Sequence, residues 1–265
     1  MDGARDDGRK KGKIDMGELS GIYAVWLREL KVFTREKSRV MGALFSPLLW
    51  IFVFGGGLGS SVSLGEGVGY QQFVFPGIVV MAVLFTSIFY GVYIIWDRKL
   101  DFLKEVLVAP VSRTSIFLAK VIGGTTEVLL EGFVLLMLGY AIGVSLTPAS
   151  IVLAMLMLAL IAAIVVSIGL IIGASLESLE GFGLIANFVV WPMFFFSGAL
   201  FPISNLPPWL EAIAIIDPLT YGVDAMRTFI LGTGRFPLAT DVGVLLFFAA
   251  LFILVGRMSF ERMRV

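Results

Sequence analysis

The sequence predicts an all-α integral membrane protein with six transmembrane helices, and three observations support this fold class. The 265 residues are 58% hydrophobic and only 15% charged, whereas soluble domains have about 25% charged residues. The mean hydropathy is +0.96, and a water-soluble fold could not hide so much apolar surface. Six apolar runs approach the length of about 20 residues that a helix needs to cross about 30 Å of hydrocarbon.

The chain begins with a charged segment followed by an amphipathic one. Residues 1–15 are rich in charge and contain glycine, so we expect a disordered tail that buries no core. Residues 17–35 predict a helix with Trp and Tyr on its apolar face, which suits a membrane–water interface. This interfacial helix either sets the angle at which the first span enters the membrane or moves with a cytoplasmic partner. Its apolar face consists of Leu19, Ile22, Tyr23, Trp26, Leu30 and Phe33.

The apolar runs occupy much of residues 16–265, which we interpret as a single transmembrane domain. The predicted spans are 40–58, 73–95, 116–144, 151–174, 182–201 and 242–255. The last run is short for a span unless it extends to about residues 238 and 258. The third run contains two acidic residues and is otherwise unbroken.

Basic residues lie mostly on one side of the predicted spans. Eighteen of the 20 Lys and Arg residues fall in segments 1–39, 96–120 and 256–265, whereas 202–239 holds only Arg227 and Arg235. Short cytoplasmic flanks of membrane helices carry an excess of Lys and Arg. The pattern therefore predicts that both termini are cytoplasmic and that residues 202–239 lie outside.

The cytoplasmic loop 96–115 contains a predicted helix that is too short to span a membrane. Its apolar stripe consists of Leu100, Leu103, Val106 and Leu107, and its other side carries Asp101, Lys104 and Glu105. Pro110 ends this helix, because the residue before a proline avoids helical geometry. A helix of this length is only marginally stable in water, so it is either a structural corner or a docking element whose stripe a partner covers.

The outside segment 202–239 is unusually apolar for a water-facing loop. Pro207 and Pro208 can open a short helix, since proline fits a first turn, and Asp217–Pro218 separates it from a second helix over 219–231. Neither helix can span, and irregular backbone at membrane depth must be covered by protein or by a water-filled cavity. The segment is therefore predicted to re-enter the outer leaflet, with a surface lid as the alternative.

Glu127 and Glu131 lie inside the third predicted span and share one helix face. A charge at the bilayer centre costs about 2.5–3.5 kcal/mol on insertion scales and indicates a functional site by default. These acids either form a proton, cation or substrate pathway, or they fix packing in protonated or hydrogen-bonded form.

Several classes of function are excluded by absent residues. The chain contains no Cys and no His, so disulfides, Cys or His metal sites and Cys or His catalysis are excluded. No G-x-x-x-x-G-K-[ST] loop is present, so this chain cannot bind ATP through that motif. The formal net charge of zero gives no indication of a nucleic-acid partner.

Four stretches together resemble the membrane subunit of ABC-2 type exporters, the drug-resistance and polysaccharide-export permeases of ATP-binding-cassette systems. They are the N-terminal interfacial helix, FLKEVLVAPVSR at 102–113, FFFSGALFPISNLPPWL at 195–210 and DPLTYGVDAMR at 217–227. The resemblance covers nearly the whole chain after residue 16 and rests on the order and spacing of the stretches.

The resemblance implies a homodimer in a prokaryotic cell membrane, driven by a separate cytoplasmic ABC ATPase that holds ATP and magnesium, with no cofactor on this chain. Region 98–108 would be the coupling helix that docks on this ATPase, with Glu177 and Glu180 nearby. The coupling residues would be Asp101, Leu103, Lys104, Glu105, Leu107, Arg113, Glu177 and Glu180. The outside pair of re-entrant helices would contain Pro207, Trp209, Pro218, Tyr221, Asp224 and Arg227.

The expected substrate is hydrophobic, lipid-like or drug-like and moves outward through the homodimer, among membrane lipids. A lipid-linked glycan or polysaccharide is the alternative substrate. A rival function is an ATP-independent transporter or channel that uses Glu127 and Glu131.

Overall fold

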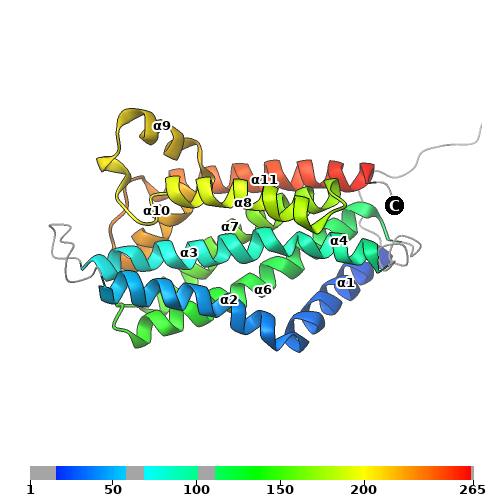
Figure 1. Cartoon of the computed structure of the whole chain (residues 1–265), viewed down its shortest axis with the longest axis horizontal. Helices are drawn as coiled ribbons and strands as arrows, with labels where there is room; N and C mark the ends of the chain where they lie inside the picture. Colours follow the sequence, from blue (N-terminus) through cyan, green and yellow to red (C-terminus); the bar gives the residue numbers. More distant parts are fainter. Residues whose placement is uncertain (1–15, 58–68, 101–110, 264–265) are drawn as a thin grey trace, which may run out of the picture.

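The computed structural model describes residues 16–57, 69–100 and 111–263, and the elements in these ranges are helices (Figure 1). The predicted tail 1–15 lies outside the described residues. The helices are α1 (Met16–Arg35), α2 (Lys37–Trp50), the π-helix η1 (Ile51–Gly57), α3 (Tyr70–Tyr90), α4 (Val92–Lys99), α6 (Arg113–Ala141), α7 (Pro148–Ser175), α8 (Leu179–Phe196), the 3-10 helix η2 (Ile203–Asn205), α9 (Pro208–Ile216), α10 (Pro218–Leu231) and α11 (Leu238–Arg262).

Within the described ranges, five helical segments are long and apolar enough to cross a membrane. They are Tyr70–Lys99, which joins α3 and α4 through Gly91, and helices α6, α7, α8 and α11. These segments confirm an all-helical, multi-pass membrane protein. The first predicted span, 40–58, corresponds to the shorter apolar stretch Met41–Phe54, so the count of six spans stays a prediction.

Local sequence signals set several helix ends. The Ser112 side chain accepts a hydrogen bond from the Ser115 N–H at the start of α6, and Thr147 forms a capping box with Ser150 at the start of α7. Such caps satisfy amide donors that have no partner inside the helix. Helix α8 ends at Phe196 rather than at residue 201, because the chain turns at Gly198 with a φ of +74°. Helix α11 is longer than the run 242–255 that predicted it.

Helix α7 lies at the centre of the bundle and contacts α3, α4, α6, α8, α10 and α11. It approaches the α3–α4 junction closely at Gly169 and Gly173: a Cβ atom added at Gly169 would collide with the Ile88 carbonyl, and one added at Gly173 with the Gly91 carbonyl. Small residues allow this close approach of membrane helices.

The two ends of the bundle carry different structures. Helix α1 packs along α6 and lies at the same end as α4, on the right in Figure 1, whereas α9 and α10 lie at the opposite end. Helix α10 is packed against α3, α7 and α11. The polar side chains that the structure buries gather mainly at these two ends.

Candidate functional site

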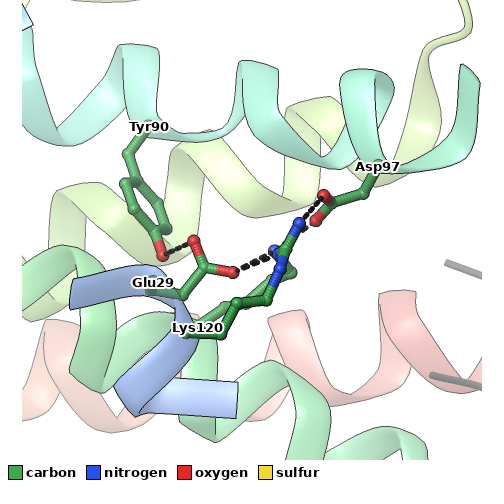
Figure 2. A network of polar contacts seen from close by, with 5 residues as sticks. Glu29, Tyr90, Asp97 and Lys120 are labelled. Carbon is green, nitrogen blue, oxygen red and sulfur yellow. Dashed lines mark hydrogen bonds and ion pairs between the residues drawn. The ribbon is translucent and has the colours of Figure 1, made fainter. Parts of the chain in front are cut away.

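A network of charged side chains joins four helices at the α1 end of the bundle (Figure 2). Helix α1 supplies Arg28 and Glu29, α3 ends with Tyr90, α4 supplies Asp97, and α6 supplies Lys120. Lys120 is only 2% exposed and Asp97 only 4%. The centre of the network therefore lies inside the bundle, and only Arg28 reaches its surface, with 33% of its side chain exposed.

Lys120 is the centre of the network. Its Nζ lies 3.0 Å from Glu29 Oε1 and 2.6 Å from Asp97 Oδ2. The Arg28 guanidinium spans the same two carboxylates, 3.0 Å from each, and the Tyr90 hydroxyl donates to Glu29 Oε2 at 3.0 Å. Two cations thus face two carboxylates. This mutual pairing offsets the large cost of removing charges from water.

Two glycines on α6 leave the space that the Glu29 and Tyr90 side chains occupy. A Cβ atom added at Gly123 would lie 3.1 Å from both Glu29 Cβ and the Tyr90 hydroxyl, and one added at Gly124 would lie 2.9 Å from the Tyr90 ring. The glycines let α1 and α3 reach α6. One turn further along, the Trp26 indole N–H donates to Thr126 Oγ1 at 3.1 Å. Helix α1 is therefore bound to α6 by polar side chains and not only by its apolar stripe.

The sequence pattern does not predict this network. The predicted apolar face of residues 17–35 leaves out Glu29, and the distribution of Lys and Arg places Lys120 only on the cytoplasmic side. A signal was present, because Glu29 lies three residues after Trp26 and four before Phe33, so these three side chains share a helix face. Phe33 and Glu29 are both 8% exposed.

Of the predicted coupling residues, five lie outside the described residues: Asp101, Leu103, Lys104, Glu105 and Leu107. Glu177 and Glu180 are exposed near the short loop between α7 and α8. Arg98 donates to the carbonyls of Ala174 and Leu176, both at 3.1 Å. This contact places the acidic loop beside the last turn of α4, which leads into the predicted coupling segment.

Arg113 has a partner at the same end. Its Nη1 donates to the carbonyls of Glu261 and Met263, at 3.1 Å and 2.7 Å. A cation at the C-terminal carbonyls of a helix is favourable. Arg113 thus fastens the start of α6 to the end of α11.

Glu127 and Glu131 are both buried on α6, 4% and 6% exposed. Glu131 lines a small cavity of about 80 Å³ together with Phe33 and Thr86. Thr86 also lines a groove of about 230 Å³ between α2 and α3, beside Ser46. The intramembrane acid at 131 therefore lies next to a mostly apolar groove on the side of the bundle.

Residues 202–239 contain two short α-helices, α9 and α10, as the proline pattern predicts. Pro207 precedes α9, whose Trp209 is 65% exposed, while Pro218 begins α10. Tyr221 is 7% exposed and its hydroxyl donates to the Ile215 carbonyl at 2.9 Å. Helix α9 thus presents apolar surface, and α10 is integrated into the bundle.

Asp217 joins the two helices and is the N-cap of α10. Its Oδ1 accepts a hydrogen bond from the Leu219 N–H at 2.9 Å, whereas its buried Oδ2 accepts none within the described residues. Burial raises the pKa of this carboxyl to about 7, against the lowering effect of the Leu219 hydrogen bond.

Asp224 and Arg227, on the next turns of α10, are both buried. The Asp224 carboxylate accepts the N–H groups of Arg235 and Phe236 at 2.8–2.9 Å. Arg227 Nη2 donates to the carbonyls of Gly198 and Ala199 at 2.7 Å and 3.0 Å. These contacts fix the turn after α8 and the loop between α10 and α11 against α10, which sequence spacing alone does not predict.

The long apolar helices define the chain as a multi-pass membrane protein. Its described residues contain no group of three or more His, Cys, Asp or Glu that could hold a metal ion. Its residues 20–231 match the family described as ABC-2 type transporter. The chain belongs to this ABC-2 type transporter family. Family membership implies an ABC ATPase as a partner and a transport role for the chain.

Curated relatives match over most of their length. The inner membrane transport permease YadH of Escherichia coli K12 is 27% identical over 244 residues, covering 88% of this chain and 92% of YadH. Nodulation protein J of Rhizobium meliloti is 30% identical over 233 residues, covering 85% and 87%. Nodulation protein J of Rhizobium leguminosarum bv. viciae is 27% identical over 246 residues, covering 90% and 93%.

Proposed function

We propose that this chain is the permease subunit of an ATP-driven exporter. It moves hydrophobic, lipid-like or drug-like molecules outward through a homodimer of six-span subunits in a prokaryotic membrane. Both termini face the cytoplasm, ATP and magnesium are bound by a separate ATPase, and this chain carries no catalytic residue. Family membership and the distribution of Lys and Arg support the proposal.

The observation that carries the proposal is the network around Lys120. Asp97 lies on α4, just before residues 101–110, and Lys120 connects it to Glu29 on α1. A displacement of the coupling segment by an ATPase would reach α1 and α6 through these ion pairs, and α3 through the hydrogen bond from Tyr90 to Glu29. Buried, mutually paired charges transmit such a displacement because separating them is costly.

The acidic loop after α7 extends the docking surface. Glu177 and Glu180 are exposed, and Arg98 holds the loop next to α4. We assign them, with Arg113 and the coupling residues 101–107, to contact with the ATPase. The outer helices α9 and α10 re-enter the membrane and cap the exit of the pathway, and Trp209 and Ile216 contact lipid there, consistent with their exposure of 65% and 73%.

Co-purification with the ATPase tests this proposal. Leu103→Asp and Leu107→Asp introduce charge on the apolar stripe, so we expect loss of the complex and of permease-stimulated ATP hydrolysis. Leu103→Met with Leu107→Met keeps the stripe apolar and should retain both. An intact, stimulated complex with the Asp variants would refute the assigned docking surface.

A second candidate is an ATP-independent transporter that uses Glu127 and Glu131. The cavity and groove beside Glu131 favour it. Proton-driven uptake by the chain alone in liposomes, abolished in Glu131→Gln, would support this candidate. A lipid-linked glycan remains the alternative cargo of the ATP-driven exporter, and transport assays with both cargo classes distinguish them.

A further inference from the structure

A pocket of about 500 Å³ opens at the α10 end of the bundle, opposite the Lys120 network. Its walls come from the start of α3, the η2 turn, α10 and the loop after α10. They combine the Phe73 ring with the polar residues Ser204, Asn205, Asp224, Arg227 and Arg235. The function proposed above does not use this pocket.

Arg227 is the buried cation of the pocket, only 7% exposed. Its Nη2 binds two main-chain carbonyls, its Nε donates to the Phe73 carbonyl at 3.4 Å, and its guanidinium carbon lies 3.8 Å from the centre of the Phe73 ring. Burial lowers the pKa of Arg227 to about 10, so the side chain stays charged at neutral pH. Within the described residues, Arg227 forms no ion pair, and Nη1 makes no hydrogen bond.

The carboxylates near the pocket are already engaged. Both oxygens of Asp224 accept main-chain N–H groups, although its charge still attracts Arg227. The Arg235 guanidinium is paired with Glu211. Arg227 is therefore the one lining cation in the described residues that is not paired with a carboxylate. The Ser204 hydroxyl contacts Asn205 Oδ1 only at 3.5 Å, longer than an ordinary O–H···O hydrogen bond, so it can turn toward a ligand. The lining thus offers three donors: the Arg227 cation, the Asn205 amide and the Ser204 hydroxyl.

A guanidinium and neighbouring uncharged donors suit a tetrahedral oxyanion, because each donor can reach a different oxygen. Apolar walls from Phe73, Ile203 and Leu231 lie beside these donors, and an ester substituent can pack on them. We propose that the pocket binds a phosphate ester, with Arg227 as the cationic anchor and Ser204 and Asn205 as flanking donors. A phospholipid headgroup and a soluble phosphate present this same chemistry.

Three probes test the site on the purified full-length chain in detergent. Dihexanoyl phosphatidylglycerol should bind saturably and raise the unfolding temperature, whereas dihexanoylglycerol, which lacks phosphate, should not. If inorganic phosphate binds more weakly than dihexanoyl phosphatidylglycerol, the ligand of the pocket is a lipid headgroup. If the two bind equally tightly, the ligand is a free phosphate. Absence of binding by both phosphate probes, or equal binding of dihexanoylglycerol, would overturn the proposal.

Ser204 provides the matched variants because its side chain is exposed and its replacement should preserve folding. Ser204→Asp places a like charge beside the phosphate, and we expect affinity to fall at least about tenfold. Ser204→Asn has nearly the same shape without the charge and should bind within about twofold of the native chain. Arg227→Lys should also weaken binding, because lysine lacks the planar fork. Unchanged affinity in Ser204→Asp would place the phosphate elsewhere and refute the site.

Discussion

Lys120 lies between two buried carboxylates, so the stability of the fold depends on its positive charge. The Lys120 Nζ forms an ion pair with each carboxylate, 3.0 Å from Glu29 Oε1 and 2.6 Å from Asp97 Oδ2. Without it, the cation left between them in the described part of the chain is Arg28, whose side chain is 33% exposed. Two anions would then remain in a medium that solvates them poorly.

We therefore expect Lys120→Met to lower the free energy of unfolding by about 3–5 kcal/mol, the usual cost of leaving a buried charge without its partner. Lys99→Met removes the same charge from an exposed position on α4 and should change stability by less than about 0.5 kcal/mol. Thermal unfolding of both variants in detergent measures the difference. Equal stability of the two would show that the network contributes little.

Asp217, the N-cap of α10, makes the stability of the chain depend on pH. Its folded pKa of about 7 exceeds the ordinary 3.8, so the folded chain holds a proton that the unfolded chain releases. The contribution of Asp217 to stability is therefore largest below about pH 4 and is lost as pH rises through about 7. Asn at this position keeps the acceptor for Leu219 N–H and cannot ionise.

Asp217→Asn should accordingly match the native chain near pH 4 and exceed it above pH 7, by up to about 4 kcal/mol at about 1.4 kcal/mol per pKa unit. Unfolding temperatures of both proteins across this range check the expectation. Parallel curves would mean that Asp217 titrates in its ordinary range.

At the scale of the helices, the contact of α7 with the α3–α4 junction depends on glycine. Gly169→Val should destabilise the bundle by about 1–3 kcal/mol, because its side chain would meet the Ile88 carbonyl. Gly183→Val on α8 is the matched control, since nothing lies within 4 Å of its added Cβ. Size-exclusion chromatography after heating compares the two, and equal survival would contradict this close packing.

The sequence predicts most helices but few contacts between them. Apolar runs predict α3, α6, α7, α8 and α11 as spans, and the proline pattern around Asp217 predicts α9 and α10. These signals are local. The Lys120 network joins residues 29, 97 and 120, and Arg227 reaches the carbonyls of residues 198 and 199. Such pairs depend on how helices pack, which hydrophobic periodicity does not specify.

For the whole molecule, the open question is whether α1 is a fixed anchor or moves with a cytoplasmic partner. Gly21 on α1 and Val111 before α6 allow a direct test, because a Cβ added at Gly21 would lie 3.5 Å from Val111 Cβ. This separation lies within the range of about 3.5–4.5 Å found in disulfides. The chain has no native Cys, so oxidation of Gly21→Cys with Val111→Cys should join these two positions alone.

If the ATPase moves the coupling segment and the Lys120 network passes this motion to α1, the disulfide should block transport in proteoliposomes containing both subunits. It should also reduce permease-stimulated ATP hydrolysis, and a reductant should restore both activities. Each single-Cys variant under the same oxidant controls for effects of oxidation itself. Full transport by the cross-linked chain would instead establish α1 as a static anchor, because its start would then be fixed to α6 throughout the cycle. The ion pairs around Lys120 would in that case serve assembly of the bundle and not its motion.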